Sequence, residues 1–326
     1  MSKEKCCKKT SIGGQALIEG IMMKSPQKTV MSVRLPDGSI DTTELKETHL
    51  KDKYKFFGIP LVRGVVNLIE SFTIGYKALM ESAEKSGFAE DEEIDEKEQT
   101  KLMAFVGILG TVLGVGLALL LFMYLPHLLF KLADNYIAGG AMSALNLKPL
   151  FEGIVKMIIF ICYVAAVSLM KDIKRVYMYH GAEHKTIFCF ESGEELTVEN
   201  VKKFKRFHPR CGTSFLFLML AVSILVTSIL AVVLPEFVIQ TGYIWVPIKI
   251  ILIPICCGLG YELIRICGRY DNLLTKIIAA PGLWIQRLTT KEPTDDMIEI
   301  AIASVKGALD MNDEPKATEE TNEAAE

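Results

Sequence analysis

The sequence lacks the features of a disulfide-stabilised or a nucleic-acid-binding protein. It has only eight cysteines in 326 residues, and Cys162, Cys256 and Cys257 lie in apolar runs, where a free thiol behaves as a small hydrophobic group. Cys6 and Cys7 stand in a lysine-rich stretch that we expect to face a reducing cytosol. The net charge is only −3, so no overall field attracts nucleic acid, and we expect no nucleic-acid partner.

The beginning of the sequence also lacks an apolar segment after its basic residues. The first twenty residues are polar or rich in glycine, so we expect no cleavable signal peptide. Insertion into a membrane would then depend on apolar segments further along the chain.

Half of the residues are hydrophobic, and they are concentrated in four long runs. Residues 102–130 and 214–234 carry no charge, and the other two runs cover 150–170 and 246–264. A helix of about 20 apolar residues is long enough to cross a bilayer. Pro254 interrupts the fourth run and favours a kinked or re-entrant helix there. We therefore predict a mainly α, polytopic membrane protein with about four transmembrane helices.

The distribution of lysine and arginine predicts the orientation of these helices. The loop 171–213 holds nine basic residues, whereas the loop 235–245 holds none. Short loops rich in lysine and arginine stay in the cytosol. The sequence therefore predicts a multi-pass protein of the plasma membrane, with the loop 171–213 and both termini in the cytosol.

The apolar runs divide the chain into six predicted parts. These are a cytosolic N-terminal region (1–100), the first two spans (101–170), a cytosolic loop that contains His and Cys (171–213), the last two spans (214–266), a cytosolic interfacial and amphipathic segment (267–310) and a disordered acidic tail (311–326). In the first part, a turn at Pro36-Asp37-Gly38 predicts a small β-hairpin. The apolar segment 59–80 carries four polar or charged residues and predicts an interfacial amphipathic helix. Residues 90–98 form an acidic linker.

The heptapeptide YHGAEHK at residues 179–185 is the strongest candidate for chemistry. His180 and His184 are four residues apart, so a helix would place both imidazoles on one face, at a spacing that can chelate one metal ion. Glu183 lies on nearly the same face and is a candidate general base for a water molecule at the metal. The order H-x-x-E-H is that of the inverted zinc-protease motif. Gly181, however, weakens the helix within the motif.

Further metal ligands are available in the segment FHPRCGTSF at residues 207–215. His208 and Cys211 offer an imidazole and a thiolate, and both suit zinc. Two interpretations remain open: a zinc centre, or a loop whose histidines pair with neighbouring glutamates. A closed site with four protein ligands would be structural and not catalytic.

Two other segments carry candidate ligand-binding residues. The basic run 202–210 would attract anionic headgroups of the lipid bilayer. Alternatively, Arg206 and Arg210 would bind a phosphate. The run also fits the ordinary basic residues that flank a transmembrane helix on its cytosolic side. Near the N-terminus, glycines flank Gln15 and Glu19 and permit close approach of the backbone to a ligand or to another helix. This segment could close the metal site, or it could form a flexible lead-in to the hairpin.

Six stretches that run from near residue 12 to about residue 305 carry a family resemblance. They are GGQALIEGIMM, PLVRGVVNLIES, YHGAEHKTI, LTVENVKKFKRFHPRCGTSFL, YELIR and PGLWIQRLTTKEP. Together they resemble the YqhQ-like family of uncharacterised bacterial membrane proteins. The resemblance implies a predicted metal-dependent enzyme and implies no substrate. The candidate metal-site residues fall inside the family motifs: His180, Glu183, His184, His208 and Cys211.

Two hypotheses for the function follow. The first is a metal-dependent membrane enzyme, a hydrolase, that acts at the cytosolic face with zinc as its cofactor. The alternative is a non-enzymatic scaffold or regulator that binds another membrane protein or lipid, because amphipathic segments at 59–80 and 294–310 flank the predicted bundle. A transporter is disfavoured, because the two clearest spans carry no charge and no inverted repeat is visible.

Overall fold

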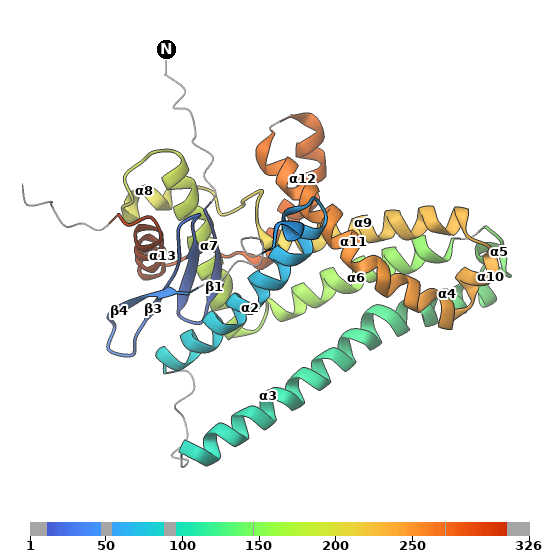
Figure 1. Cartoon of the computed structure of the whole chain (residues 1–326), viewed down its shortest axis with the longest axis horizontal. Coiled ribbons are helices and arrows are strands. Elements are labelled where there is room, and N and C mark those ends of the chain that lie inside the picture. Colours follow the sequence, from blue (N-terminus) through green and yellow to red (C-terminus); the bar gives the residue numbers. More distant parts are fainter. Residues whose placement is uncertain (1–11, 47–53, 88–95, 146, 271, 312–326) are drawn as a thin grey trace, which may run out of the picture.

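The computed structural model describes residues 12–46, 54–87, 96–145, 147–270 and 272–311. Cys6, Cys7, most of the acidic linker and residues 312–326 of the tail lie outside these ranges, so the predictions made for them are not addressed by the structure. Within the described ranges, the protein has a small sheet at one end and a bundle of long helices at the other (Figure 1).

A four-stranded antiparallel sheet forms the N-terminal part of the fold. Its strands, in the order β1-β2-β3-β4, are β1 (Gly13–Leu17), β2 (Gly20–Lys24), β3 (Thr29–Arg34) and β4 (Ile40–Leu45). Strands β3 and β4 form the predicted hairpin, and Gly38 supplies the positive φ of 87° that its turn requires. Strands β1 and β2 form a second hairpin, with Glu19 at φ 49° in its turn. This segment is therefore ordered, and it is not the flexible lead-in that was one of the alternatives for it.

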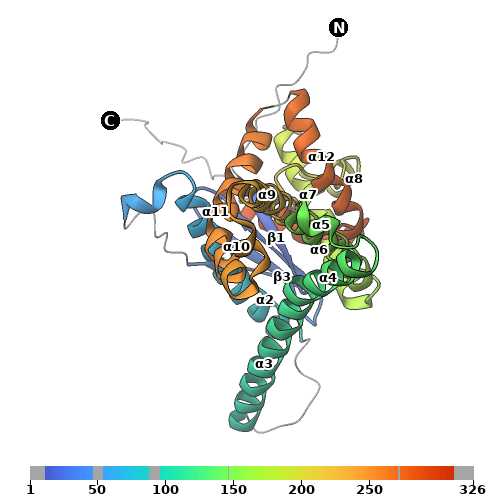
Figure 2. The same ribbon diagram turned by 90° about the vertical axis from the view of Figure 1, so that its right-hand side faces the viewer.

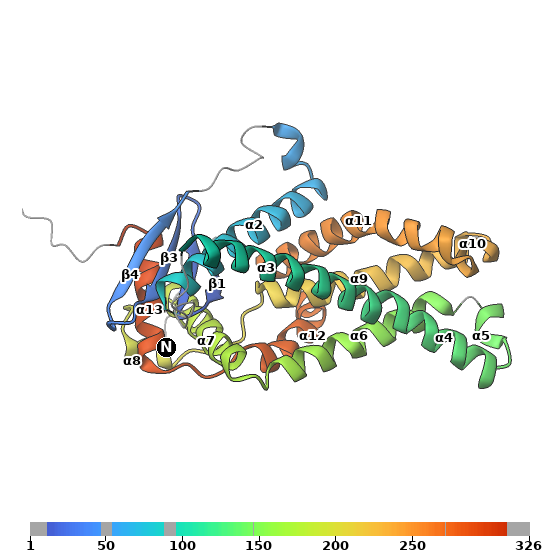
Figure 3. The same cartoon turned by 90° about the horizontal axis from the view of Figure 1, so that it is seen from below.

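Helices cover both faces of this sheet. On one face, α7 (Lys171–Glu191) and α13 (Asp295–Ala308) bury Ile21, Met23 and Val30. On the other face, α2 (Val62–Lys85) packs against the alternate residues Met31 and Val33. This alternation follows from the two-residue period of a strand. We call the sheet with α2, α7 and α13 the sheet layer (Figure 3).

Four helices are long and apolar enough to cross a membrane, which confirms the predicted class of fold. They are the segment Leu109–Tyr136 and the helices α6 (Lys148–Val167), α9 (Gly212–Val233) and α11 (Gly242–Arg269). The first segment joins α3 (Glu96–Leu119), a π-helical turn (Leu120–Tyr124) and α4 (Leu125–Tyr136). Helix α9 packs against both α6 and α11, whereas α3 projects away from the bundle (Figure 2). Helix α11 is continuous through Pro254 over its whole length.

The remaining described helices are short or lie at the ends of the bundle. They are η1 (Lys55–Gly58), α5 (Ala141–Ala144), α8 (Val198–Lys202), α10 (Glu236–Gln240) and α12 (Leu273–Thr289). Helix α12 packs against the start of α9, and residues 290–294 then lead to α13, which returns to the sheet layer. Residues 290–294 therefore connect the helical bundle to the sheet layer.

Helix α2 is fixed to the bundle by an ion pair between Arg63 and Glu262 of α11. The guanidinium of Arg63 donates to both carboxylate oxygens of Glu262 at 2.7 and 2.6 Å, whereas Arg265 lies 4.0 Å from the same carboxylate. Arg63 is therefore the principal partner of Glu262. Asn67 also donates to the hydroxyl of Tyr261 at 2.8 Å, which adds a second polar link between α2 and α11.

The opposite face of α2 is apolar and exposed. Ile69, Phe72, Tyr76 and Met80 follow one another at helical spacing, and each is more than half exposed. A helix with one packed face and one exposed apolar face is suited to lie at a membrane surface, as the sequence predicts for this segment.

Candidate metal centre

The H-x-x-E-H motif lies in the middle of α7, as predicted from its spacing, and Gly181 has a packing role there. A Cβ atom at Gly181 would lie 2.0 Å from the carbonyl oxygen of Lys291. The N–H of Lys291 also donates to the carbonyl of Tyr177 at 2.8 Å, so the segment after α12 runs directly against α7. The glycine that weakens the helix is therefore the residue that admits this segment.

Three metal-binding donor atoms converge on one point. One donor atom each from His180, His184 and Cys211 lies within 4.8 Å of the other two, and Nε2 of His180 is 3.2 Å from Sγ of Cys211. Bonds to zinc of 2.0–2.3 Å in tetrahedral geometry place neighbouring donors roughly 3.3–3.8 Å apart. The observed spacing therefore needs only small side-chain movements to hold such an ion. We call His180, His184 and Cys211 the three-donor group.

Backbone carbonyl groups orient both imidazoles. Nδ1 of His180 lies 2.9 Å from the carbonyl oxygen of Thr289, and Nδ1 of His184 lies 2.6 Å from that of Arg206. A carbonyl oxygen can only accept, so each Nδ1 carries a proton, and each Nε2 is the nitrogen that could bind a metal in place of a second proton. Metal-ligating histidines are usually held in this way by a partner on the second ring nitrogen. The pattern therefore fits a metal centre better than it fits two histidines paired with glutamates.

The surroundings of Cys211 favour its thiolate form. Burial by itself would raise the pKa of this thiol, but the positive charge of His180 and His184 outweighs burial and lowers the pKa well below its ordinary value. Cys211 is also the residue that precedes the first turn of α9, where the helix dipole favours a negative charge. A thiolate is the form in which cysteine binds a metal.

Glu183 lies beside the three-donor group with an unsatisfied oxygen. The side chain is only 4% exposed, and burial raises the pKa of its carboxyl group above the ordinary value, although His180 and His184 oppose this effect. The N–H of Gly14 in β1 donates to the carboxylate, while Oε2 has no hydrogen-bond partner. Buried carboxylate oxygens are normally paired, so this atom fits a site that takes a water molecule or a ligand.

The N-terminal hairpin packs against α7 at Glu183, which is a close approach to another helix of the kind that its glycines permit. A Cβ atom at Gly14 would lie 3.1 Å from Cδ of Glu183 and 2.6 Å from the carbonyl oxygen of Met22. Only glycine therefore allows β1 to keep both its pairing with β2 and its contact with α7.

His208 lies beside the three-donor group but outside it. Its ring centroid is 5.5 Å from that of His184, and its Nδ1 accepts from the N–H of Arg210 at 3.3 Å. Burial, together with the charge of His184, lowers the pKa of His208 to about 2, so the ring is neutral. Of the two further ligands predicted from the sequence, the three-donor group includes Cys211 and leaves out His208.

Gln286 holds the segment that carries Cys211, a role that no pattern in the sequence predicts. Its fully buried side chain accepts from the N–H of His208 at 2.7 Å and donates to the carbonyl of His208 at 2.7 Å. It also donates to the hydroxyl of Ser214 at 2.8 Å. These bonds fix both sides of Cys211 to α12. A buried glutamine in an amphipathic helix is not distinguishable by sequence from an exposed one.

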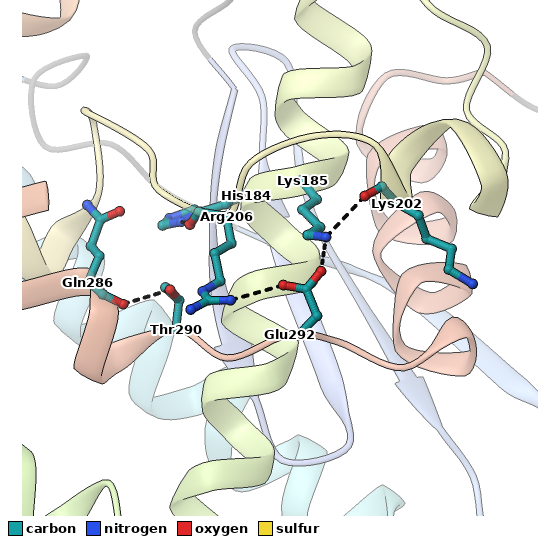
Figure 4. Close-up of polar contacts among 7 residues, drawn as sticks. All are labelled: His184, Lys185, Lys202, Arg206, Gln286, Thr290 and Glu292. Carbon is teal, nitrogen blue, oxygen red and sulfur yellow. Dashed lines mark hydrogen bonds and ion pairs between the residues drawn. The ribbon is translucent and has the colours of Figure 1, made fainter.

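The two arginines predicted to bind phosphate have acidic partners within the chain. Arg206 donates to Glu292 at 3.0 Å, and Lys185 pairs with the same carboxylate (Figure 4). Arg210 pairs with Glu191. These contacts join the 202–210 segment to α7 and to the segment after α12. A phosphate-binding role for either arginine remains a prediction.

Gln15 and Glu19 are placed away from the three-donor group. Glu19 pairs with Arg175 and accepts from the hydroxyl of Tyr179 at 3.0 Å, so it links the first hairpin to α7. The side chain of Gln15 fills the space left by Gly75 in α2. Both residues position the hairpin, and their predicted contact with a ligand stays a prediction.

Replacing Gly181 with alanine should disrupt the centre without changing any candidate ligand. Alanine is the better helix former by about 1 kcal/mol, yet its Cβ would collide with the Lys291 carbonyl, and overpacking of this kind costs about 1–3 kcal/mol. We expect a lower melting temperature and a loss of bound zinc, because the carbonyl of Thr289 moves with the displaced segment. Gly242→Ala is the matched control, since nothing lies within 4 Å of its Cβ position. Equal zinc content in the two variants would contradict this account.

Comparison with known proteins places the chain in a family. Residues 59–311 match the family model described as "Protein of unknown function (DUF1385)". The chain is 32% identical over 317 residues to the "Uncharacterized protein YqhQ" of Bacillus subtilis (strain 168), and the match covers 95% of both sequences. No solved structure matches the chain. Neither similarity names a metal, a substrate or a reaction, but the extent of both shows that this chain belongs to the DUF1385 family, as the YqhQ-like motifs of its sequence indicated.

Proposed function

We propose that the protein is a zinc-dependent hydrolase that acts at the cytosolic surface of the membrane. The observation that carries the proposal is the three-donor group, whose two histidines are oriented by backbone carbonyls next to a buried carboxylate with a free oxygen. Imidazole and thiolate donors suit zinc, and three protein ligands leave a fourth position open.

Metal binding and proton transfer would be carried out by different residues. His180, His184 and Cys211 would hold the ion. Zinc held in this way supplies Lewis acidity and an activated water molecule. Glu183 would take a proton from water and return it to a leaving group, because its carboxyl group lies beside the three-donor group with one oxygen unpaired. The N–H of Gly14 would hold the carboxylate in place during both transfers.

The location of the centre supports a substrate at the membrane surface. Cys211 immediately precedes α9, which begins at Gly212 and is one of the four candidate spans. Helix α12, which supplies the carbonyl of Thr289, exposes Leu273, Leu274, Ile277 and Trp284. Exposed apolar and tryptophan side chains are typical of helices at the headgroup level. The centre would therefore lie where a membrane-bound substrate can be reached.

Removal and restoration of the metal tests the proposed activity. Purified protein should cleave at least one substrate in a set of 4-nitrophenyl esters, phosphoesters, peptides and extracted membrane lipids. A chelator should abolish the cleavage, and one equivalent of zinc should restore it, because the ion supplies the Lewis acid. Bound zinc without hydrolysis of any member of the set would instead favour the scaffold hypothesis, with the three-donor group as a structural site.

The proposed orientation has its own test. Glu194 and Glu236 are exposed, and each would be replaced by cysteine. Glu194 lies in the lysine- and arginine-rich loop 171–213, and Glu236 lies in the loop 235–245, which has no basic residue. In intact cells, a membrane-impermeant thiol reagent should label position 236 and leave position 194 unlabelled, relative to the unmodified chain, because loops rich in lysine and arginine stay in the cytosol. Permeabilised cells should label both positions. Labelling of position 194 alone in intact cells would place the metal centre outside the cytosol.

A further inference from the structure

A second group of ionisable side chains, some buried and some partly exposed, lies among the helices of the bundle, at the end opposite the sheet layer. It comprises His127 of α4, Lys148, Glu152 and Lys156 of α6, and Lys249 of α11, and we call it the lysine cluster. Figure 1 places α4, α10 and the start of α11 at this end, far from α7. Lys156 and Lys249 lie roughly 10–12 Å from the first residues of their helices, at 1.5 Å per residue. The cluster is therefore within the depth of the candidate spans.

The cluster contains one carboxylate. Glu152 is only 2% exposed, and its Oε2 accepts from Nζ of Lys249 at 3.0 Å. Its Oε1 lies 3.5 Å from Nδ1 of His127 and makes no hydrogen bond within the described residues. The other buried carboxylate at this end, Asp134, is bound by the backbone N–H groups of Met142 and Ser143. Glu152 is therefore the acidic group that the lysines of the cluster share.

Positive charge is consequently in excess. Three ammonium groups face one carboxylate. Lys148 is 2% exposed and donates to the carbonyl of Ile239 at 3.0 Å, and it interacts electrostatically with Glu152, which already binds Lys249. Lys156 interacts electrostatically with Glu152 and with Lys249, but makes no hydrogen bond or ion pair with any residue that the structure describes.

A buried hydrogen-bond donor adds a second, independent sign of a missing acceptor. Trp245 is 1% exposed, and its Nε1 finds no hydrogen-bond partner among the described residues. Nζ of Lys249 lies 6.0 Å from the centre of the Trp245 ring, so this donor belongs to the same region of α11. Buried indole N–H groups normally have a partner.

We propose that the lysine cluster binds the phosphate group of an anionic ligand, with Lys156 as its principal contact. Unpaired charges within a membrane protein are costly and mark binding sites or pathways. An anion would balance the excess ammonium charge and could accept from the indole of Trp245. A phosphate suits ammonium donors, which bind it as point charges. The ligand is either the headgroup of an anionic phospholipid or free phosphate. The inference is independent of the proposed hydrolase activity.

Thermal unfolding of the full-length protein in detergent tests the site. Phosphatidylglycerol should raise the melting temperature of the unmodified protein by about 5 °C, as expected for a ligand well above its dissociation constant, whereas zwitterionic phosphatidylcholine should not. Lys156→Gln should lose most of this shift, and it should fold normally because it removes an ammonium that has no partner. Lys131→Gln, which removes an exposed lysine of α4, is the matched control and should keep the shift.

Inorganic phosphate, added in place of the lipid, identifies the source of the anion. Stabilisation by phosphatidylglycerol alone identifies a lipid headgroup, and equal stabilisation by inorganic phosphate identifies a free anion; either supports the site. If Lys156→Gln failed to fold, Trp284→Phe would leave Trp245 as the sole tryptophan, and its emission should shift on addition of the anion. No shift in stability or emission with either probe, or the same shift in Lys156→Gln and Lys131→Gln, would overturn the proposal.

Discussion

Replacing Cys211 with alanine should remove nearly all zinc from the purified protein. Cys211 supplies the thiolate of the three-donor group, and its loss leaves only two imidazoles. Loss of a residue that merely orients a ligand costs about 10–100-fold in metal affinity, so we expect a larger decrease from the loss of a ligand itself. Metal analysis of protein prepared without chelator gives the result directly, and His184→Ala should behave in the same way.

Two controls make the loss of zinc specific. Cys189→Ala removes a buried thiol from the same helix that carries the histidines, but one that lies outside the three-donor group, and it should keep its zinc. His208→Gln should also keep most of its zinc, because the ring nitrogens of His208 are not part of the group. If His208→Gln lost zinc as completely as Cys211→Ala, His208 would be a fourth ligand and the centre would be closed and structural.

Replacing Glu183 with glutamine should separate catalysis from metal binding. The amide keeps the shape of the side chain but cannot take up a proton, and loss of a general base lowers turnover by about 10²–10⁴-fold. We expect zinc content and melting temperature to stay close to those of the unmodified protein while metal-dependent hydrolysis falls by this factor. The measurement is the rate of cleavage of whichever substrate the unmodified protein accepts.

The matched control for Glu183→Gln is Glu194→Gln, which changes an exposed glutamate just after α7. This variant should hydrolyse at the normal rate. Full activity in Glu183→Gln would remove the general base from the proposal and leave a zinc site without a catalytic carboxylate. Loss of zinc in Glu183→Gln would instead make Glu183 a ligand.

The membrane part of the fold could be predicted because it depends on local composition. An apolar run must form a helix in lipid, where each backbone group has to be paired within its own segment. The predicted run 214–234 and the helix α9 at Gly212–Val233 agree almost residue for residue. The run 102–130 locates the first span less well, because the helix continues through Pro126 to Tyr136.

Helical period also predicted part of the metal centre. His180 and His184 lie on one face of α7 because four residues make slightly more than one turn. The choice of Cys211 over His208 depends instead on how Gln286 holds the intervening segment. Gln286 is 78 residues away from His208 along the chain, and no local pattern contains that information.

The hairpin of β1 and β2 could not be predicted because of its glycines. Gly13 and Gly14 are compatible with a flexible segment, since glycine weakens a strand in isolation. In the fold, Gly14 is needed for the close approach of β1 to Glu183, and Glu19 adopts the positive φ of the turn. Such a glycine signals close contact only once the partner helix α7 is in place.

X-ray absorption at the zinc edge of the purified protein would show directly whether His180, His184 and Cys211 bind zinc. We expect zinc bound by two nitrogen ligands at about 2.0–2.1 Å and one sulfur ligand at about 2.3 Å, with one lighter atom to complete the shell. Cys211→Ala should abolish the sulfur contribution together with most of the metal. A purified protein that holds no zinc, or zinc with no sulfur ligand, would contradict the assignment of His180, His184 and Cys211 as a metal centre.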